Sequence, residues 1–407
     1  MFSILRFKLV RMLLSALAIV SVSGIAAAGS KAYVGNFKDN TVSVIDTTAG
    51  VVIATIPIAA GPHGMALSPD ERLLYVSSDG SSIVSIIDTS TDVVTKTIEV
   101  GKSPHGVTLV PGKDLLLVAV NGEDKIAFID TVKQGVIATV DVGKPHTIGV
   151  GPDGKMAYIS SQVPGKFEIA VVDLATRKVV RTIALDKTPR DLEYSYDGKA
   201  VYFTKAGANV IDVLDPASNT IVAEIPTGVS PHYVNHPRNT IYGMAIVQGP
   251  GELFLFDPMT NKAVRSIKVG DQPHWLAVAG DGKTAYVTNE GSNNLSIVDI
   301  ATGKTTTVAV GNQPRKIVVQ PLTAGATVTI ENFAFIPQVI TISPGESVTW
   351  TNKDGGPHAI AFKDGTTGSD TLFPGKIFSR IFDRPGNYEY FCSIHSYMTG
   401  RIEVRQQ

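Results

Sequence analysis

The sequence has almost no cysteine: Cys392 is the only one among 407 residues. A single thiol excludes an internal disulfide, so the folded chain depends on core packing alone. It also excludes a dinuclear copper centre, which needs two bridging thiolates, and it cannot supply the paired C-x2-C spacing common in structural zinc sites. The chain lacks a charge excess as well, with a formal net charge of −1. No basic patch indicates a nucleic-acid partner.

Long apolar runs are missing beyond the N-terminus, so we expect no membrane span in the mature chain. The N-terminus has three basic residues, a short apolar core and three alanines: Arg6, Lys8 and Arg11, then 12–22, then 26–28. This order is typical of a secretory signal peptide, here residues 1–28, with a mature chain from about Gly29. The pattern predicts a periplasmic or secreted protein. An uncleaved membrane anchor is the alternative, although the apolar core is short for a span.

Most of the chain is an internal repeat. Seven aspartates end apolar runs at intervals of 42 or 43 residues: Asp46, Asp88, Asp130, Asp173, Asp215, Asp257 and Asp299. Each repeat contains four apolar runs separated by turns, which predicts a four-stranded antiparallel sheet. Seven such sheets indicate a seven-bladed β-propeller over residues 29–320. We interpret the aspartates as turn caps.

The two ends of the repeat region are complementary. Residues 32–34 match the second strand of a repeat, whereas 315–320 match only the first strand. We therefore expect these terminal strands to share one sheet and close the ring, which leaves no open sheet edge.

One position after a proline recurs once in every repeat and carries only histidine or arginine. Its occupants are His63, His105, His146, Arg190, His232, His274 and Arg315. The first strand of each blade is innermost, so these residues are expected to gather around one mouth of the channel. Three interpretations stay open: a second metal site, an anion or cofactor site held by the arginines, or blade packing without a ligand. His236 is out of register and is expected to be ordinary.

The segments Y-V-G-N, Y-V-S-S and Y-V-T-N, with S-V-I-D and the V-G-x-x-P junctions, resemble the YVTN-type propeller repeats. The resemblance covers residues 31–320. It implies the fold and says little about function, because such propellers serve many roles.

Beyond the repeats, residues 326–405 contain seven short apolar segments separated by Gly and Pro, which predict a β-sandwich. The expected strands are 327–332, 339–343, 347–352, 358–362, 377–382, 387–391 and 400–404. His358 begins one of them, and Cys392, His395 and Met398 lie on the loop joining the last two. A thiolate, two imidazoles and a thioether are the donor set of a mononuclear blue-copper site. A buried structural cysteine, a catalytic Cys–His pair and a metal-free sandwich are the alternatives.

The motifs G-E-S-V-T-W-T-N-K-D, P-H-A-I and G-N-Y-E-Y-F-C-S-I-H-S-Y-M-T-G resemble the cupredoxin family, in its plastocyanin/amicyanin branch. The C-x2-H-x2-M spacing is similar to the short ligand loop of amicyanins. The resemblance implies one type 1 copper with His358, Cys392 and His395 as strong ligands and Met398 as the weak axial ligand. Ala359 stands where the family usually has an asparagine that ties the ligand loops together. The contacts that support the copper ligands are therefore expected to differ from those of the family.

The sequence thus predicts an all-β protein with a seven-bladed propeller at 29–320, a linker at 321–326 and a cupredoxin domain at 327–407. Six residues reach at most about 20 Å, so the two domains are expected to lie close together. The expected function is one-electron transfer at copper. His395 would be the outlet, beside Ile394 and Tyr397. The partner would be a redox protein such as a cytochrome or a copper- or quinone-linked oxidoreductase.

Two alternatives remain for the function. The first is an oxidoreductase whose centre is the histidine/arginine ring of the propeller, with the copper domain as its relay. The second is a binding or adhesion scaffold with structural copper. An electron carrier is favoured over a stand-alone enzyme, and no catalytic residue is assigned.

Overall fold

The computed structural model describes residues 30–320, 326–342, 346–366, 368–382 and 384–405. The expected signal peptide and residues 321–325 of the expected linker lie outside this part of the chain. The described residues form strands and one short 3-10 helix, η1 (Asn121–Glu123). This confirms the all-β prediction. Within these ranges no helix has the length and apolarity needed to cross a membrane.

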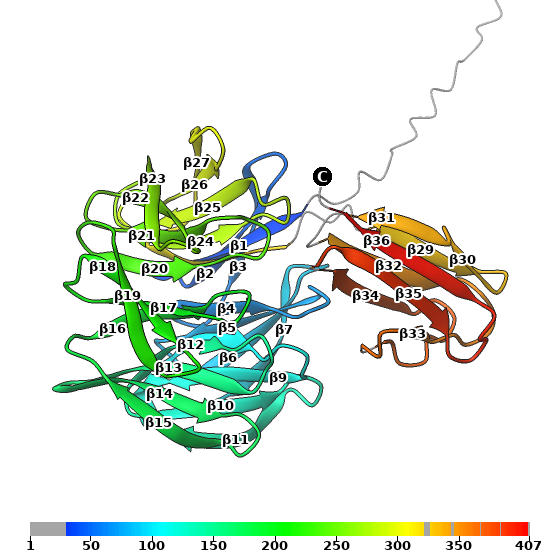
Figure 1. Ribbon diagram of the computed structural model, residues 1–407, viewed down its shortest axis with the longest axis horizontal. Helices are drawn as coiled ribbons and strands as arrows, with labels where there is room; N and C mark the ends of the chain where they lie inside the picture. The colour runs from blue at the N-terminus through cyan, green and yellow to red at the C-terminus, as the bar shows by residue number, and fades with distance from the viewer. Residues whose placement is uncertain (1–29, 321–325, 343–345, 367, 383, 406–407) are drawn as a thin grey trace, which may run out of the picture.

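Seven four-stranded antiparallel sheets occupy the described chain before residue 321 (Figure 1). The sheet with order β28-β1-β2-β3 contains β1 (Lys31–Asn36), β2 (Thr41–Asp46), β3 (Val51–Pro57) and β28 (Pro314–Val319). The next three contain β4 (Pro62–Leu67), β5 (Leu73–Ser78), β6 (Ile83–Asp88) and β7 (Val93–Glu99); β8 (Pro104–Leu109), β9 (Leu115–Val120), β10 (Lys125–Asp130) and β11 (Gly135–Asp141); and β12 (Pro145–Val150), β13 (Met156–Val163), β14 (Lys166–Asp173) and β15 (Lys178–Ala184).

The last three sheets follow the same order along the chain. They contain β16 (Pro189–Tyr194), β17 (Val201–Lys205), β18 (Val210–Asp215) and β19 (Thr220–Pro226); β20 (Pro231–Asn235), β21 (Gly243–Val247), β22 (Glu252–Asp257) and β23 (Lys262–Lys268); and β24 (Pro273–Val278), β25 (Thr284–Asn289), β26 (Asn294–Asp299) and β27 (Thr305–Ala309).

The first strands of the sheets form a closed circle. Each of β4, β8, β12, β16, β20, β24 and β28 contacts the next, and β28 returns to β4. The closing sheet joins the two ends of the repeat region, with Ala32 opposite Val319 and Val34 opposite Ile317. The expected sharing of one sheet by the terminal strands is confirmed. The circle places the same position of every repeat around one channel.

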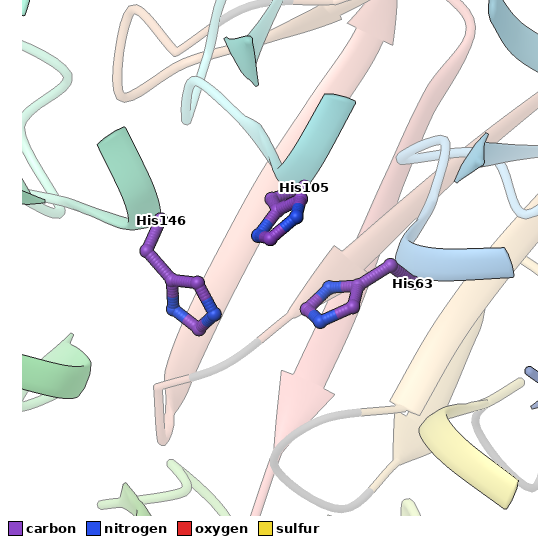
Figure 2. A group of neighbouring side chains, drawn as sticks. All are labelled: His63, His105 and His146. Carbon is purple, nitrogen blue, oxygen red and sulfur yellow. The ribbon is translucent and has the colours of Figure 1, made fainter. Parts of the chain in front are cut away.

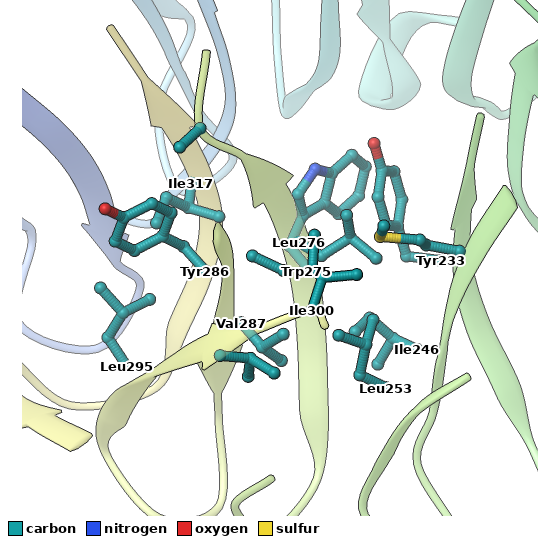
Figure 3. Packing of buried hydrophobic residues seen from close by; sticks show 14 of the residues in the cluster. Tyr233, Ile246, Leu253, Trp275, Leu276, Tyr286, Val287, Leu295, Ile300 and Ile317 are labelled. Atoms are coloured by element: carbon teal, nitrogen blue, oxygen red, sulfur yellow. The ribbon is translucent and has the colours of Figure 1, made fainter. Parts of the chain in front are cut away.

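Apolar side chains from neighbouring sheets fill the space between them. One core cluster joins Tyr286 and Leu276 of β25 and β24 to Ile317 of β28 (Figure 3). Ala32 and Val34 of β1 belong to the same cluster, so the core continues across the closing sheet. Burial of such side chains contributes about 25 cal/mol per Å² of apolar surface. This packing holds the ring without a disulfide.

The repeated aspartates cap turns, as expected. Asp46 Oδ1 accepts hydrogen bonds from the backbone N–H of Thr48 (2.8 Å) and Ala49 (2.9 Å). The same pattern of one or more bonds to residues two or three positions on recurs at Asp88, Asp130, Asp173, Asp215, Asp257 and Asp299. Their periodicity is therefore structural.

The described residues between 326 and 404 form a sandwich of two four-stranded sheets, with orders β30-β29-β32-β34 and β31-β36-β35-β33. The strands are β29 (Ala326–Glu331), β30 (Ala334–Ile336), β31 (Val339–Ile342), β32 (Glu346–Asn352), β33 (Ile360–Phe362), β34 (Ile377–Phe382), β35 (Gly386–Cys392) and β36 (Thr399–Val404). Trp350 and Tyr390 are fully buried between the sheets. Figure 1 shows this sandwich in orange and red beside the propeller.

Two details of the sandwich differ from the expectation. β30 is an additional strand that was not predicted. Its three residues are too few to show a pattern of alternating apolar and polar side chains. His358 does not begin a strand: it forms an isolated bridge with Leu372, and β33 starts two residues later. Pro357, directly before His358, has no N–H to donate to a neighbouring strand. The ligand is therefore held by a loop.

Candidate metal centre

Three of the four expected copper ligands meet at one end of the sandwich. Cys392 Sγ lies 3.7 Å from His358 Nδ1 and 3.8 Å from His395 Nδ1. One donor atom from each residue lies within 4.8 Å of the other two. Cys392 and His358 are fully buried, and His395 is half-buried. Two imidazole nitrogens facing one thiol at this spacing fit a single small metal ion.

The backbone of the 392–398 loop positions these donors. Cys392 is the last residue of β35 rather than part of the loop, and its N–H donates to Met398 O at 3.0 Å. The Met398 N–H in turn donates to His395 O at 2.9 Å. Met398 is 3% exposed and packs in the same core cluster as Cys392. A short loop closed by its own hydrogen bonds therefore carries His395 and Met398 back toward the thiol.

The first histidine has a carboxylate partner that the sequence did not indicate. His358 Nε2 donates to Asp354 Oδ2 at 3.0 Å. Asp354 is itself held by the backbone N–H groups of Asn332 (2.6 Å) and Phe333 (2.9 Å). A proton on Nε2 leaves the lone pair on Nδ1, which is the nitrogen that faces Cys392. This bond orients the ring for a metal.

The absence of an asparagine after His358 is compensated by other contacts. The Ala359 N–H points at Cys392 Sγ at 3.5 Å, and Ser393 N–H donates to Ala359 O at 3.0 Å. The buried amide of Asn352 donates to Gly356 O and Leu372 O, each at 2.8 Å. The two ligand segments are thus joined through backbone groups and Asn352.

Burial also sets the protonation state of His358. Desolvation lowers its pKa below the usual value, although the Asp354 charge and hydrogen bond act in the opposite direction. A neutral imidazole is the form that binds a metal. The donor set therefore fits copper, with soft sulfur for Cu(I) and imidazole for both redox states.

Apolar side chains surround the half-buried His395. Ile394 is 46% exposed, Tyr397 70% and Phe333 47%. The Phe333 ring meets the His395 ring edge-on, with centroids 5.0 Å apart, and the Tyr397 ring lies 6.2 Å away. Ile394 and Tyr397 were expected here, whereas Phe333 comes from the turn after β29. The structure thus presents an apolar surface beside one ligand.

The repeated histidine/arginine position of the propeller is the second residue of each inner strand. Three of its seven residues meet (Figure 2). The ring centroids of His63 and His105 are 4.5 Å apart, those of His105 and His146 5.0 Å, and those of His63 and His146 5.6 Å. The side chains of this set therefore gather at one level of the channel.

The other four residues of the set have different partners. The rings of His232 and His274 lie 4.2 Å apart. Arg190 Nη1 donates to Gln248 Oε1 at 3.0 Å, and Arg315 pairs with Glu290 at 3.3 Å. Burial lowers the pKa of His232 to about 3, with further contributions from the Arg190 and His146 charges. The structure thus divides the set into a group of three histidines and four residues that contact one another or other side chains.

The inner strands also carry a charged group that was not predicted from the sequence. Asp191, Glu193 and Lys316 line a cavity together with His63 and Trp275. Burial raises the pKa of Glu193 to about 7 and lowers that of Lys316 to about 8. The Lys316 Nζ lies 3.5 Å from the centre of the Trp275 ring. The available signal was the presence of charges at inner-strand positions where other repeats carry glycine, threonine or aromatic residues.

His236 was expected to be ordinary and lies away from the repeated position. Its ring packs edge-on against Tyr196 and Tyr202, at 4.8 and 6.2 Å. Burial lowers its pKa. Its environment is that of a core histidine.

Two family models match this chain. Residues 323–405 match the copper binding proteins of the plastocyanin/azurin family, and residues 21–113 match a YNCE-like β-propeller. Amicyanin of Paracoccus versutus is 36% identical over 83 residues, covering 19% of this chain and 62% of the amicyanin. Amicyanin-alpha of Methylorubrum extorquens is 35% identical over 92 residues, covering 21% of this chain and 77% of that protein.

A solved structure resembles the propeller. Hydrazine synthase of Kuenenia stuttgartiensis superposes with a TM-score of 0.60 at 20% identity, covering 70% of this chain and 99% of the other. At this identity the likeness shows the fold alone.

Fold and site together define a β-propeller joined to a copper-binding cupredoxin domain. Through residues 323–405 the chain belongs to the plastocyanin/azurin family of copper-binding proteins. A domain of this family implies one type 1 copper, and the predicted cofactor is confirmed at that level. It also supports copper electron transfer and a redox partner of some kind.

Proposed function

We propose that this protein is a periplasmic blue-copper electron carrier whose propeller serves as a docking or cofactor-binding platform. The observation that supports this most strongly is the approach of Cys392 Sγ to His358 Nδ1 and His395 Nδ1 at 3.7 and 3.8 Å. The proposed ligands are His358, Cys392 and His395, with Met398 as the weak axial donor. The proposed division is a signal peptide at 1–28, the propeller at 29–320, a linker at 321–326 and the copper domain at 327–407.

Copper held by this donor set supplies a one-electron Cu(I)/Cu(II) couple. The protein holds the ligand side chains in place whether or not copper is bound. This fixed geometry keeps Cu(I) and Cu(II) close in energy. His358 is fixed by Asp354, and Cys392 by the backbone bonds of its loop. Burial of Cys392 and His358 keeps water away from the thiolate. Little reorganisation is then needed when the charge changes.

The surface formed by Phe333, Ile394 and Tyr397 is the proposed exit for the electron. It brackets His395, the ligand that is not fully buried. An apolar surface allows a partner to approach closely without tight binding, which suits rapid exchange. The proposed partner is a cytochrome or a copper- or quinone-linked oxidoreductase outside the cytoplasm.

A second function, an oxidoreductase with a further centre in the propeller, is favoured by one observation: the approach of His63, His105 and His146. A binding scaffold with structural copper is the third. Copper-loaded wild type and Cys392→Ser should be compared by optical absorption and by cyclic voltammetry. An intense visible thiolate-to-copper band and a reversible one-electron wave, both lost in Cys392→Ser, support the carrier. A colourless chain unaffected by the substitution contradicts it and supports the scaffold.

A further inference from the structure

We propose that His63, His105 and His146 bind a divalent first-row transition-metal ion in the propeller channel, as a second metal centre independent of the Cys392 site. One ring nitrogen from each of the three lies within 4.8 Å of the other two. Figure 2 shows the three rings turned toward a common space from three successive inner strands. Imidazole nitrogen is a ligand suited to zinc, copper, nickel and iron.

The strands that carry these three histidines approach one another closely. His63 and His105 are each followed by glycine, and the strands pack tightly there. A Cβ on Gly64 would collide with the His105 carbonyl oxygen, and a Cβ on Gly106 with the His146 carbonyl oxygen. The following repeats carry Thr147 and then Asp191, Tyr233, Trp275 and Lys316 at this position. The two glycines therefore permit the close approach of β4 to β8 and of β8 to β12.

Hydrogen bonding fixes which nitrogen of His146 is available. Its Nδ1 lies 2.9 Å from the carbonyl oxygen of Arg190. A carbonyl can only accept, so Nδ1 carries the proton and Nε2 carries the lone pair. Burial lowers the pKa of His146 to about 3, which keeps the ring neutral at ordinary pH. His146 thus presents a free donor atom.

His105 is oriented by a carboxylate, which is a common arrangement at metal sites. Its Nε2 lies 2.9 Å from Asp79 Oδ1, and this hydrogen bond is the largest cause of the lowered pKa of Asp79. The proton belongs on Nε2, so the lone pair is on Nδ1. That Nδ1 is buried and has no hydrogen-bond partner among the described residues. An unmade bond at a buried acceptor is costly, and a metal ion would satisfy it.

His63 completes the group and is the ring that must move. It is 9% exposed, and no hydrogen bond of its ring is found in the described part of the chain. It is stacked on His105 with an angle of 18° between the ring planes. Because each lone pair lies in its ring plane, binding by all three requires His63 to turn out of this stack. That rotation breaks no hydrogen bond found here.

The surroundings suit a cation with an open coordination position. Asp79 supplies negative charge behind His105. The positive charge of Arg315 acts on His63 and His146, and its pairing with Glu290 offsets it. A cavity lined by Gly64, Gly106 and Thr147 leaves space next to the His63 ring. Three imidazoles with a free fourth position are the donor set of metal sites that bind water or a small ligand.

The test counts copper on the full-length protein. Chelator-treated chain is loaded with Cu²⁺, separated from free ion, and analysed by metal quantification, optical absorption and electron paramagnetic resonance. We expect two copper ions per wild-type chain, with a nitrogen-coordinated signal in addition to the blue-copper signal. His105→Gln and His146→Gln should each retain one copper and an unchanged visible band. Asp79→Asn should weaken the second ion about 10–100-fold, because Asp79 orients His105.

His232→Gln is the matched control, since it removes a histidine of the same repeated position outside the group of three. It should keep both ions. Circular dichroism with thermal unfolding verifies that each variant is folded, and for any variant that is not, the wild-type count alone decides. One copper per wild-type chain overturns the proposal, as does a second ion that survives both His105→Gln and His146→Gln. Either result leaves the visible band, and hence the proposed electron transfer, untouched.

Discussion

The carboxylate of Asp354 lies 3.0 Å from Nε2 of His358, four residues away and on the side of the ring opposite Cys392. A carboxylate that accepts a hydrogen bond from Nε2–H increases the electron density of the imidazole. A more basic imidazole stabilises Cu(II) relative to Cu(I). We therefore expect Asp354 to influence the reduction potential of the proposed copper site without touching the metal.

Asp354→Asn should raise the reduction potential. Loss of the carboxylate weakens Cu(II) binding more than Cu(I) binding, and each tenfold difference between the two corresponds to about 59 mV. We expect an upward shift of tens of millivolts, measured by voltammetry on the copper-loaded chain. Asp364→Asn, which alters an exposed carboxylate bonded to Thr366 in the same domain, should leave the potential unchanged. A downward shift in Asp354→Asn would contradict the assignment.

Lys316→Met should destabilise the propeller, because Asp191 and Glu193 then share the channel without a cation. The loss in the free energy of unfolding should reach up to about 3 kcal/mol. It should be larger at pH 8 than at pH 5, since the pKa of Glu193 is raised to about 7 and the group is neutral in acid. Denaturant titration at both pH values measures it. Adding Glu193→Gln should recover part of the loss; no recovery would show that the charges are not coupled.

His232→Gln should reduce the acid sensitivity of the fold. Burial lowers the pKa of His232 to about 3, against about 6.5 in the unfolded chain. Between these values the unfolded state binds a proton that the folded state does not. Stability from this residue is complete above pH 6.5 and falls by up to about 1.4 kcal/mol per pH unit below it. The difference in unfolding free energy between wild type and variant, measured at pH 7, 6, 5 and 4, should therefore shrink as the pH falls. A constant difference would refute the buried neutral ring.

Ile394→Glu should slow electron exchange without changing the copper site. Its side chain is 46% exposed beside His395, so a charge there disturbs the apolar surface and leaves the ligands in place. Electron self-exchange, followed by nuclear magnetic resonance of mixed oxidised and reduced protein, should slow by at least tenfold. Ile336→Glu, at a similarly exposed position of β30, is the comparison variant. Equal rates in both variants would remove this surface from the electron path.

Much of the fold could be predicted because the same residue pattern recurs in every repeat. Seven aspartates at 42- or 43-residue intervals predicted the turn at the same place in each repeat. Each turn uses the same local hydrogen bonds. The closing sheet followed from the unequal ends of the repeat region. β30 could not be predicted, because three residues carry no usable alternation and the strand exists only through its pairing with β29.

The donors of the copper site were visible because thiol, imidazole and thioether have few other reasons to share a short segment. The partners of those donors were not. Asp354 looks like one of many exposed turn residues until folding brings it to His358. In the propeller, periodicity predicted which residues share a level of the channel but not which of them touch. That depends on how each ring is oriented by its neighbours, such as Asp79 beside His105, and these contacts form only in the folded chain.

Copper titration of the full-length chain, monitored by visible absorption, tests the central claim most directly. An intense thiolate-to-copper charge-transfer band should grow until the blue site is full at one equivalent. It should be absent in Cys392→Ser and unchanged in His105→Gln. If the wild-type chain binds cupric ion and no such band develops, Cys392 is not a copper ligand, and the protein is not a blue-copper electron carrier.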